Sequence, residues 1–179
     1  MDPVEQTPTR PADYAALTAG YGALAAAVLL AARDSGDEPI RPGELLPMGA
    51  ATFALSKLIA KEKVESWMRE PFVEELPGGE RRPKGHGLRY AVGELLTCTR
   101  CVGSWSSLAL VGLRLTRPRE ARVLTAVLAT SALNDWLQSG FSLLCAEGNA
   151  AARAADGAAA DAADAAAADA QRRRFTRST

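Results

Sequence analysis

Two cysteines separated by two residues are the groups in this sequence best suited to chemistry. Cys98 and Cys101 stand at the start of an apolar segment, just after the stretch Glu94-Leu95-Leu96-Thr97. A cysteine at a helix N-terminus has its thiolate favoured by exposed N–H groups and by the helix dipole, and Arg100 adds positive charge. The pair therefore indicates one of three roles: structural packing at a helix start, metal binding, or thiol redox exchange.

A zinc site is the cofactor hypothesis that this pair supports. Structural zinc needs four ligands, and the chain offers Cys98 and Cys101 together with Cys145 and its single histidine, His86. A dimer could instead supply a second cysteine pair. The redox alternative lacks the βαβ pattern that surrounds thioredoxin-like motifs. The three roles stay open at this point.

Asn134 and Asp135 form a second candidate site, inside an apolar block that runs from residue 123 to 146. An ionisable residue within a membrane span is costly and tends to face a bundle interior or a polar path. Asp135 could thus serve a small ion or solute transporter, or pair with Lys57. The plainer interpretation is an interhelical hydrogen bond that fixes packing.

The sequence lacks the motifs of the common enzyme and nucleic-acid-binding classes. It contains no phosphate-binding loop, nucleophile elbow or paired catalytic carboxylates. Lys plus Arg and Asp plus Glu number 21 each, so bulk charge gives no reason to expect a nucleic-acid partner. We expect a non-enzymatic protein without an identified substrate.

Four apolar blocks would position these candidate sites, and they predict an all-α, multi-pass transmembrane helical bundle. The membrane domain covers residues 14–146 and follows an N-terminal arm, residues 1–13. Residues 14–32 carry no charge, and at 1.5 Å per residue they would cover about 30 Å of hydrocarbon. A cleaved secretory signal is the competing interpretation, but the residues before this block are mainly acidic. The predicted spans are residues 14–32, 45–60, 95–115 and 123–146.

The second block is short for a span and begins with Pro47 in its first turn. Beyond it, alternating apolar and charged residues predict an amphipathic helix along the membrane interface, with Lys61 and Glu65 spaced to pair. Residues 71–87 are rich in Pro and Gly, a composition that predicts neither helix nor strand. The whole connection, residues 61–94, is predicted to be a basic loop near the anionic leaflet.

The distribution of Lys and Arg predicts the sidedness of this bundle. With four spans, or with three if the second block lies on the surface, residues 61–94 and the tail are cytoplasmic. The three-span arrangement puts the amino terminus outside. We expect a bacterial cell-membrane protein with the lipid bilayer as its partner, and homo-oligomers are compatible with it.

The tail, residues 147–179, is of low complexity, with long Ala runs interrupted by Asp and closed by Arg. Ala favours helix, yet the segment has few large apolar residues to bury. It is predicted to be disordered or partly helical.

Four motifs of this chain are found together in one known family. They are Phe53 to Lys61 followed by Arg69-Glu70-Pro71-Phe72, then Glu94-Leu95-Leu96-Thr97-Cys98, Cys101-Val102-Gly103-Ser104-Trp105, and Asn134-Asp135-Trp136-Leu137-Gln138. On these motifs the chain resembles the bacterial membrane proteins grouped as domain of unknown function 1360, over roughly residues 50 to 145. The resemblance implies an integral membrane protein without assigned activity. Where such proteins often carry Pro and an aromatic between the cysteines, this chain has Thr99 and Arg100.

The leading hypothesis from sequence is a structural or regulatory membrane component whose paired cysteines stabilise the cytoplasmic end of a helix. A transporter that uses Asp135 and a thiol redox or zinc-binding membrane protein are the alternatives.

Overall fold

The structure is a computed structural model that describes residues 6–34 and 40–177, with side chains through residue 162. The described part is mostly helical and contains six α-helices, one short 3-10 helix and two short strands. In chain order the elements are α1 (Pro11–Asp34), α2 (Pro42–Lys61), η2 (Lys63–Glu65), α3 (Ser66–Arg69), β1 (Val73–Glu75), β2 (Arg81–Pro83), α4 (Leu88–Thr97), α5 (Thr99–Thr116) and α6 (Pro118–Arg177).

The chain divides after Leu133 into two compact parts. The first part, which ends at Leu133, holds every element up to α5 and the beginning of α6. The second part, from Asn134 on, is the remainder of α6. The cysteine pair and the segments around it all belong to the first part.

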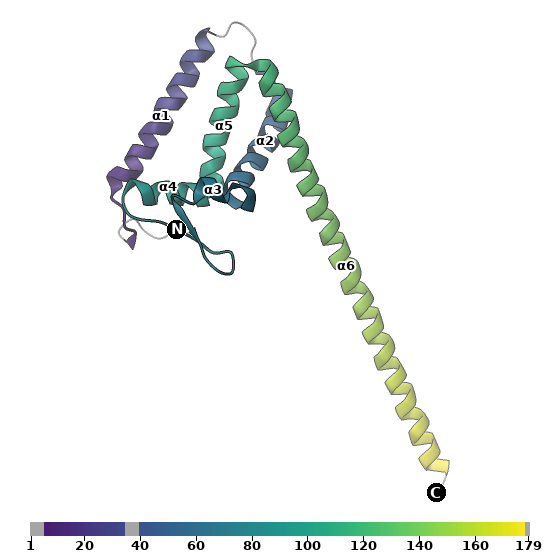
Figure 1. Cartoon of the computed structure of the whole chain (residues 1–179). Coiled ribbons are helices and arrows are strands. Elements are labelled where there is room, and N and C mark those ends of the chain that lie inside the picture. Colours follow the sequence, from purple (N-terminus) through teal and green to yellow (C-terminus); the bar gives the residue numbers. More distant parts are fainter. Residues whose placement is uncertain (1–5, 35–39, 178–179) are drawn as a thin grey trace. The chain divides into compact units, whose positions relative to one another are not determined.

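In the first part, α5 packs against α1 and against α2, while α3, α4 and the strands gather near the start of α5 (Figure 1). The interface between α2 and α5 is built from small side chains. Ala51, Ala54 and Ser56 of α2 are buried, and Gly103 of α5 lies beside Ser56. Small residues let two helix backbones approach closely, which is how helices commonly pack in membranes.

One described helix, α1, is long and apolar enough over Pro11–Arg33 to cross a membrane. None of its apolar window is buried inside the protein, so α1 is not the core helix of a soluble domain. A membrane anchor and a signal sequence both have these properties. Of the four spans predicted from sequence, the described residues thus show one helix that meets the length and hydropathy of a membrane span, and it lies near the N-terminus.

The prediction that residues 71–87 form neither helix nor strand is wrong, and the fold is not purely α. β1 and β2 pair antiparallel, with Val73 opposite Pro83 and Glu75 opposite Arg81. Gly78 and Gly79 have φ values of +94° and +85°, a backbone conformation that favours glycine and lets the chain reverse here. Val73 is buried, so the hairpin has its own anchor in the core.

The helices differ from the predicted spans in two places. The segment 95–115 is not one helix, because Cys98 adopts an extended conformation (φ −94°, ψ 103°) and separates α4 from α5. α2 begins at Pro42, so Pro47 lies inside the helix instead of in its first turn. The expected amphipathic continuation is broken as well, since Glu62 is extended (φ −76°, ψ 146°) and ends α2.

The low-complexity tail is helical through Arg177, so disorder was the wrong alternative for its described residues. The high helix propensity of Ala accounts for this outcome. Residues 178–179 at its end, and residues 1–5 of the predicted arm, lie outside the described part.

Candidate functional site

The break between α4 and α5 forms the candidate site, because it turns Cys98 into the N-cap residue of α5. The Cys98 Sγ accepts a hydrogen bond from the backbone N–H of Cys101 at 3.3 Å. The Cys101 thiol also donates to the Cys98 Sγ, and the two sulfur atoms are 2.7 Å apart. Both cysteines are free and half-buried. A disulfide has a sulfur–sulfur distance of about 2.05 Å, so a small movement would join them.

The two thiols differ in acidity although they touch. Burial opposes ionisation of Cys98, but the hydrogen bonds from the Cys101 side chain and backbone and the Arg100 charge outweigh it and lower its pKa below 9.0. Burial, together with the bond to Cys98, raises the pKa of Cys101 to about 11. The pair thus contains one sulfur that ionises readily and one that keeps its proton.

Neighbouring helices hold the break between α4 and α5 in place. The backbone N–H of Cys98 donates to the Glu94 carbonyl at 3.1 Å, and Thr97 Oγ1 donates to the same carbonyl at 3.0 Å. From α1, the Tyr14 hydroxyl donates to the Glu94 carboxylate, and Tyr21 meets Trp105 of α5 edge to face with ring centroids 5.4 Å apart. α1 is therefore part of the scaffold that positions the cysteines.

Within the described residues of the first part, His86 does not join the cysteine pair in a metal-binding group. His86 lies in the bend before α4, and Cys145 is an exposed residue of α6 in the second part. Within residues 6–34 and 40–177, no three His, Cys, Asp or Glu side chains gather where they could share a metal ion. Zinc binding by Cys98 and Cys101 stays a prediction.

Asn134 and Asp135 begin the second part, on α6, where Asn134 is exposed and Asp135 half-buried. Lys57, the predicted partner of Asp135, lies 3.7 Å from the Glu62 carboxylate. The transport role of Asp135 stays a prediction.

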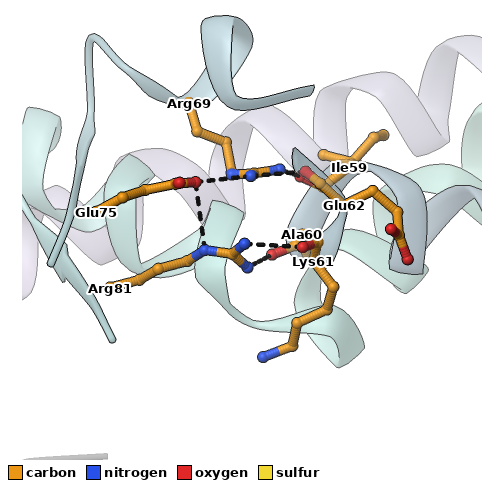
Figure 2. Close-up of polar contacts among 7 residues, drawn as sticks. All are labelled: Ile59, Ala60, Lys61, Glu62, Arg69, Glu75 and Arg81. Carbon is orange, nitrogen blue, oxygen red and sulfur yellow. Dashed lines mark hydrogen bonds and ion pairs between the residues drawn. The ribbon is translucent and has the colours of Figure 1, made fainter. Parts of the chain in front are cut away.

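A cluster that sequence reasoning missed closes the C-terminal end of α2 (Figure 2). Arg69 is only 1% exposed, and its guanidinium donates to the carbonyls of Ile59 and Glu62. Arg81 from the hairpin donates to the carbonyls of Ala60 and Lys61. These are terminal carbonyls of a helix, which have no partner within the helix itself.

Glu75 joins the two arginines of this cluster. Its carboxylate lies 2.9 Å from Arg69 and 3.5 Å from Arg81 (Figure 2). The hydrogen bond from Arg69 holds the pKa of Glu75 below its usual range. The sequence signal for the cluster was the Arg69-Glu70-Pro71-Phe72 motif that carries the family resemblance, but nothing in its spacing shows that Arg69 is buried.

The opposite end of α2 has a second buried arginine that the sequence did not single out. Arg114 of α5 is 5% exposed. Its Nε and Nη2 atoms donate hydrogen bonds to the two carboxylate oxygens of Glu44, at 2.6 and 3.2 Å. The hydrogen bond from Arg114 lowers the pKa of Glu44. Charged groups therefore fasten α2 to its neighbours at both ends.

These features define the class: a helical protein with an apolar N-terminal helix, buried arginines at helix ends, and a dithiol that caps a helix. The family model "Protein of unknown function (DUF1360)" matches residues 47–141, more than half of the chain, and the protein belongs to this family. The match contains the cysteine pair, the Arg69 cluster and Arg114, and it confirms the resemblance seen in the sequence. No curated protein and no solved structure matches the chain.

Proposed function

We propose that this protein is a multi-pass bacterial membrane protein whose Cys98–Cys101 dithiol undergoes reversible oxidation at the cytoplasmic end of the bundle. The single observation that supports the dithiol role is the direct contact of the two sulfur atoms at the start of α5, at 2.7 Å. A regulatory membrane component, the leading hypothesis from sequence, would use this pair as its responsive element.

The membrane assignment is supported by large apolar side chains that lie exposed on the surface of the protein. Leu29 is 68% exposed and Leu46 is 80% exposed, whereas Arg69 and Arg114 are buried. Burying one such side chain contributes about 1.5–3 kcal/mol, so an aqueous surface with many of them would be costly. A bilayer accepts these side chains and leaves the polar groups inside.

The lengths of the helices also fit a bilayer. α2 has 20 residues and α5 has 18, which correspond to about 30 and 27 Å of helix. We place the uncharged stretch Val102–Leu113, about 18 Å long, in the middle of the α5 span, with Arg100 and Arg114 at the two interfaces. Cys98 and Cys101 then lie just outside the hydrocarbon.

A contact near the amino terminus favours the four-span arrangement over the three-span one. The backbone N–H of Gly87, in the connection before α4, donates to the carbonyl of Pro8 at 2.8 Å. The start of α1 thus lies at the same end as the connection 61–94, whereas three spans would put them on opposite sides. The same contact, with the Tyr14–Glu94 bond, supports retention of α1 over its removal as a signal.

Sidedness can be tested with single cysteines in a background that carries Cys98→Ser, Cys101→Ser and Cys145→Ser. Arg41 precedes α2 and Arg82 lies in the hairpin, and both are exposed. In intact cells without an outer membrane, a membrane-impermeant maleimide should label Arg41→Cys at once and Arg82→Cys only after lysis. Equal labelling of both before lysis, or release of the protein by a carbonate wash, would contradict the multi-pass proposal.

The dithiol role predicts a defined reaction with glutathione disulfide. The Cys98 thiolate attacks one sulfur of the disulfide, whose S–S bond breaks and releases one glutathione thiolate. Cys101 then loses its proton and attacks the Cys98 sulfur, which forms the internal disulfide and releases the second glutathione.

Gel-shift counting of free thiols on purified protein tests this step. Two thiols should disappear in wild type and in Cys145→Ser, and return after reduction. Cys101→Ser should stop at the mixed disulfide. If wild type keeps all its thiols across a range of glutathione potentials, the redox role is wrong and a structural or metal role remains.

A further inference from the structure

Beside Cys101 the structure contains a cavity of about 370 Å³ between α1 and α5. Tyr14, Thr18 and Tyr21 line it from α1, and Cys101, Ser104 and Trp105 line it from α5. Its volume falls within the range of small-molecule sites, about 300–1,000 Å³. One residue of the dithiol, Cys101, is thus among the residues that line the cavity.

The lining of this cavity combines aromatic rings with hydroxyl groups. Tyr21 and Trp105 meet edge to face at 5.4 Å and form an aromatic corner. The Thr18 and Ser104 hydroxyls donate to helix carbonyls at 3.0 and 3.3 Å, and rotation would free them to reach a ligand oxygen. No charged side chain is among the described residues that line it.

A larger cavity of about 480 Å³ adjoins the first and is lined almost entirely by apolar side chains. The two cavities share Leu95 and Trp105, and the larger one extends along α5 past Leu108 and Gly112, between α1 and α2. The cavity with aromatic rings and hydroxyls and the apolar cavity therefore lie next to each other, and Cys101 is among the residues that line the first.

We infer that the cavity beside Cys101 binds the ring of a lipid-soluble quinone, which accepts the two electrons of the Cys98–Cys101 dithiol. This inference rests on the proposed dithiol function and names its electron acceptor. A quinone ring is flat, uncharged and carries two carbonyl oxygens, which suits the aromatic corner and the hydroxyls. Its hydrocarbon tail suits the apolar chamber, whereas a charged peptide disulfide suits neither.

The reaction balances without a further reactant. Cys98 reacts as its thiolate: a bond forms between the Cys98 and Cys101 sulfur atoms, the S–H bond of Cys101 breaks, and two electrons pass to the quinone. The proton from Cys101 and one from solvent convert the two carbonyls to the hydroxyls of the hydroquinone. The dithiol is oxidised to a disulfide and the quinone is reduced.

Thr18 and Thr130 provide a matched pair of variants for the test. Each is an exposed helical threonine whose hydroxyl donates to the carbonyl four residues earlier, at 3.0 Å for Thr18 and 2.8 Å for Thr130. Thr18→Phe places a ring in the cavity. Thr130→Phe adds the same bulk to α6, away from the residues that line the cavity.

The experiment uses reduced full-length protein in detergent, without oxygen, with decylubiquinone as the probe and glutathione disulfide in a parallel sample. We expect one quinone to be consumed per dithiol in wild type and in Thr130→Phe. In Thr18→Phe the quinone reaction should slow at least about tenfold, the effect of about 1.4 kcal/mol, while the glutathione reaction stays unchanged. Cys98→Ser with Cys101→Ser should consume no quinone.

The outcomes separate this inference from the proposed function. If glutathione disulfide oxidises the dithiol and decylubiquinone does not, or if Thr18→Phe reacts with the quinone as fast as wild type, the quinone site is wrong and the dithiol function stands. If neither oxidant forms the disulfide in wild type, the dithiol function itself fails.

Discussion

Two helix ends meet at the same end of the first part of the chain, and each needs partners for its backbone groups. At the end of α2, the carbonyls are covered by the guanidinium groups of Arg69 and Arg81 (Figure 2). At the start of α5, a backbone N–H is covered by the sulfur of Cys98. The same structural requirement is thus met by two very different kinds of group.

The difference lies in whether the capping group can change. A guanidinium stays protonated in proteins at every ordinary pH, so the cap on α2 is permanent. A thiol can ionise, be oxidised or bind metal, so the cap on α5 depends on the chemical state of Cys98. The cap on α2 is therefore suited to stability, whereas under the proposed dithiol function the cap on α5 would change with oxidation.

The largest expected effect comes from removing the permanent cap. Arg69→Met leaves the carbonyls of Ile59 and Glu62 without the guanidinium donor, while Glu75 keeps its ion pair with Arg81. Leaving a backbone carbonyl without its hydrogen-bond donor costs about 1–3 kcal/mol for each carbonyl. Thermal unfolding in detergent should show a large loss for Arg69→Met and almost none for Arg82→Met, an exposed arginine of the same hairpin. Equal stability of the two variants would mean that the cap on α2 is dispensable.

A second expectation concerns how the hairpin is brought to the end of α2. A Cβ atom at Gly93 of α4 would lie 2.6 Å from the Phe72 carbonyl oxygen and 2.9 Å from the Pro83 Cβ. Gly93→Ala should therefore push the hairpin away and cost about 1–3 kcal/mol. Gly49→Ala in α2 is the control, because nothing lies within 4 Å of its added Cβ. That change should stabilise the helix by about 0.5–1 kcal/mol, and destabilisation by both would contradict the packing argument.

A smaller effect is expected at the responsive cap. Cys98→Ala removes the N-cap acceptor and should cost about 1 kcal/mol, whereas Cys98→Ser keeps an acceptor that helix starts favour. Both changes abolish the internal disulfide, so stability and redox chemistry can be measured separately. If the Ala and Ser variants unfold at the same temperature, Cys98 does not act as a cap.

The sequence identified the cysteine pair, the family and the apolar N-terminal helix, because each is a local pattern. It did not reveal the break at Cys98, since one extended residue inside a continuous apolar run leaves no mark on hydropathy. It also missed the paired strands at Val73 and Pro83. The two strands pair with each other across a turn, and the Pro and Gly content of that turn is equally typical of an irregular loop.

The buried arginines were the least predictable feature. Arg69 and Arg114 are indistinguishable by type and local spacing from exposed arginines such as Arg82 and Arg100. Their burial depends on where the last carbonyls of α2 and the Glu44 carboxylate come to lie in three dimensions. A residue pattern along one helix cannot show a contact between residues 70 positions apart.

The smallest expected effect is on the pH dependence of stability, in which the two helix ends should act in different pH ranges. The hydrogen bond from Arg69 lowers the pKa of Glu75, so the stabilisation it gives is complete above pH 4.5 and is lost as pH falls through the folded-state pKa. In the alkaline range the two cysteines have opposite effects. The lowered pKa of Cys98 stabilises the folded protein as this thiol ionises, whereas the pKa of Cys101, raised to about 11, destabilises it as pH rises above 9.0. The free energy of unfolding should be measured across pH. Glu75→Gln should flatten only the acid limb of this curve, and Cys98→Ser with Cys101→Ser should flatten only its alkaline limb. Glu74→Gln, exposed on the same strand, should leave both limbs as in wild type, and a change of the acid limb by the cysteine variant would show that the two ends are not independent.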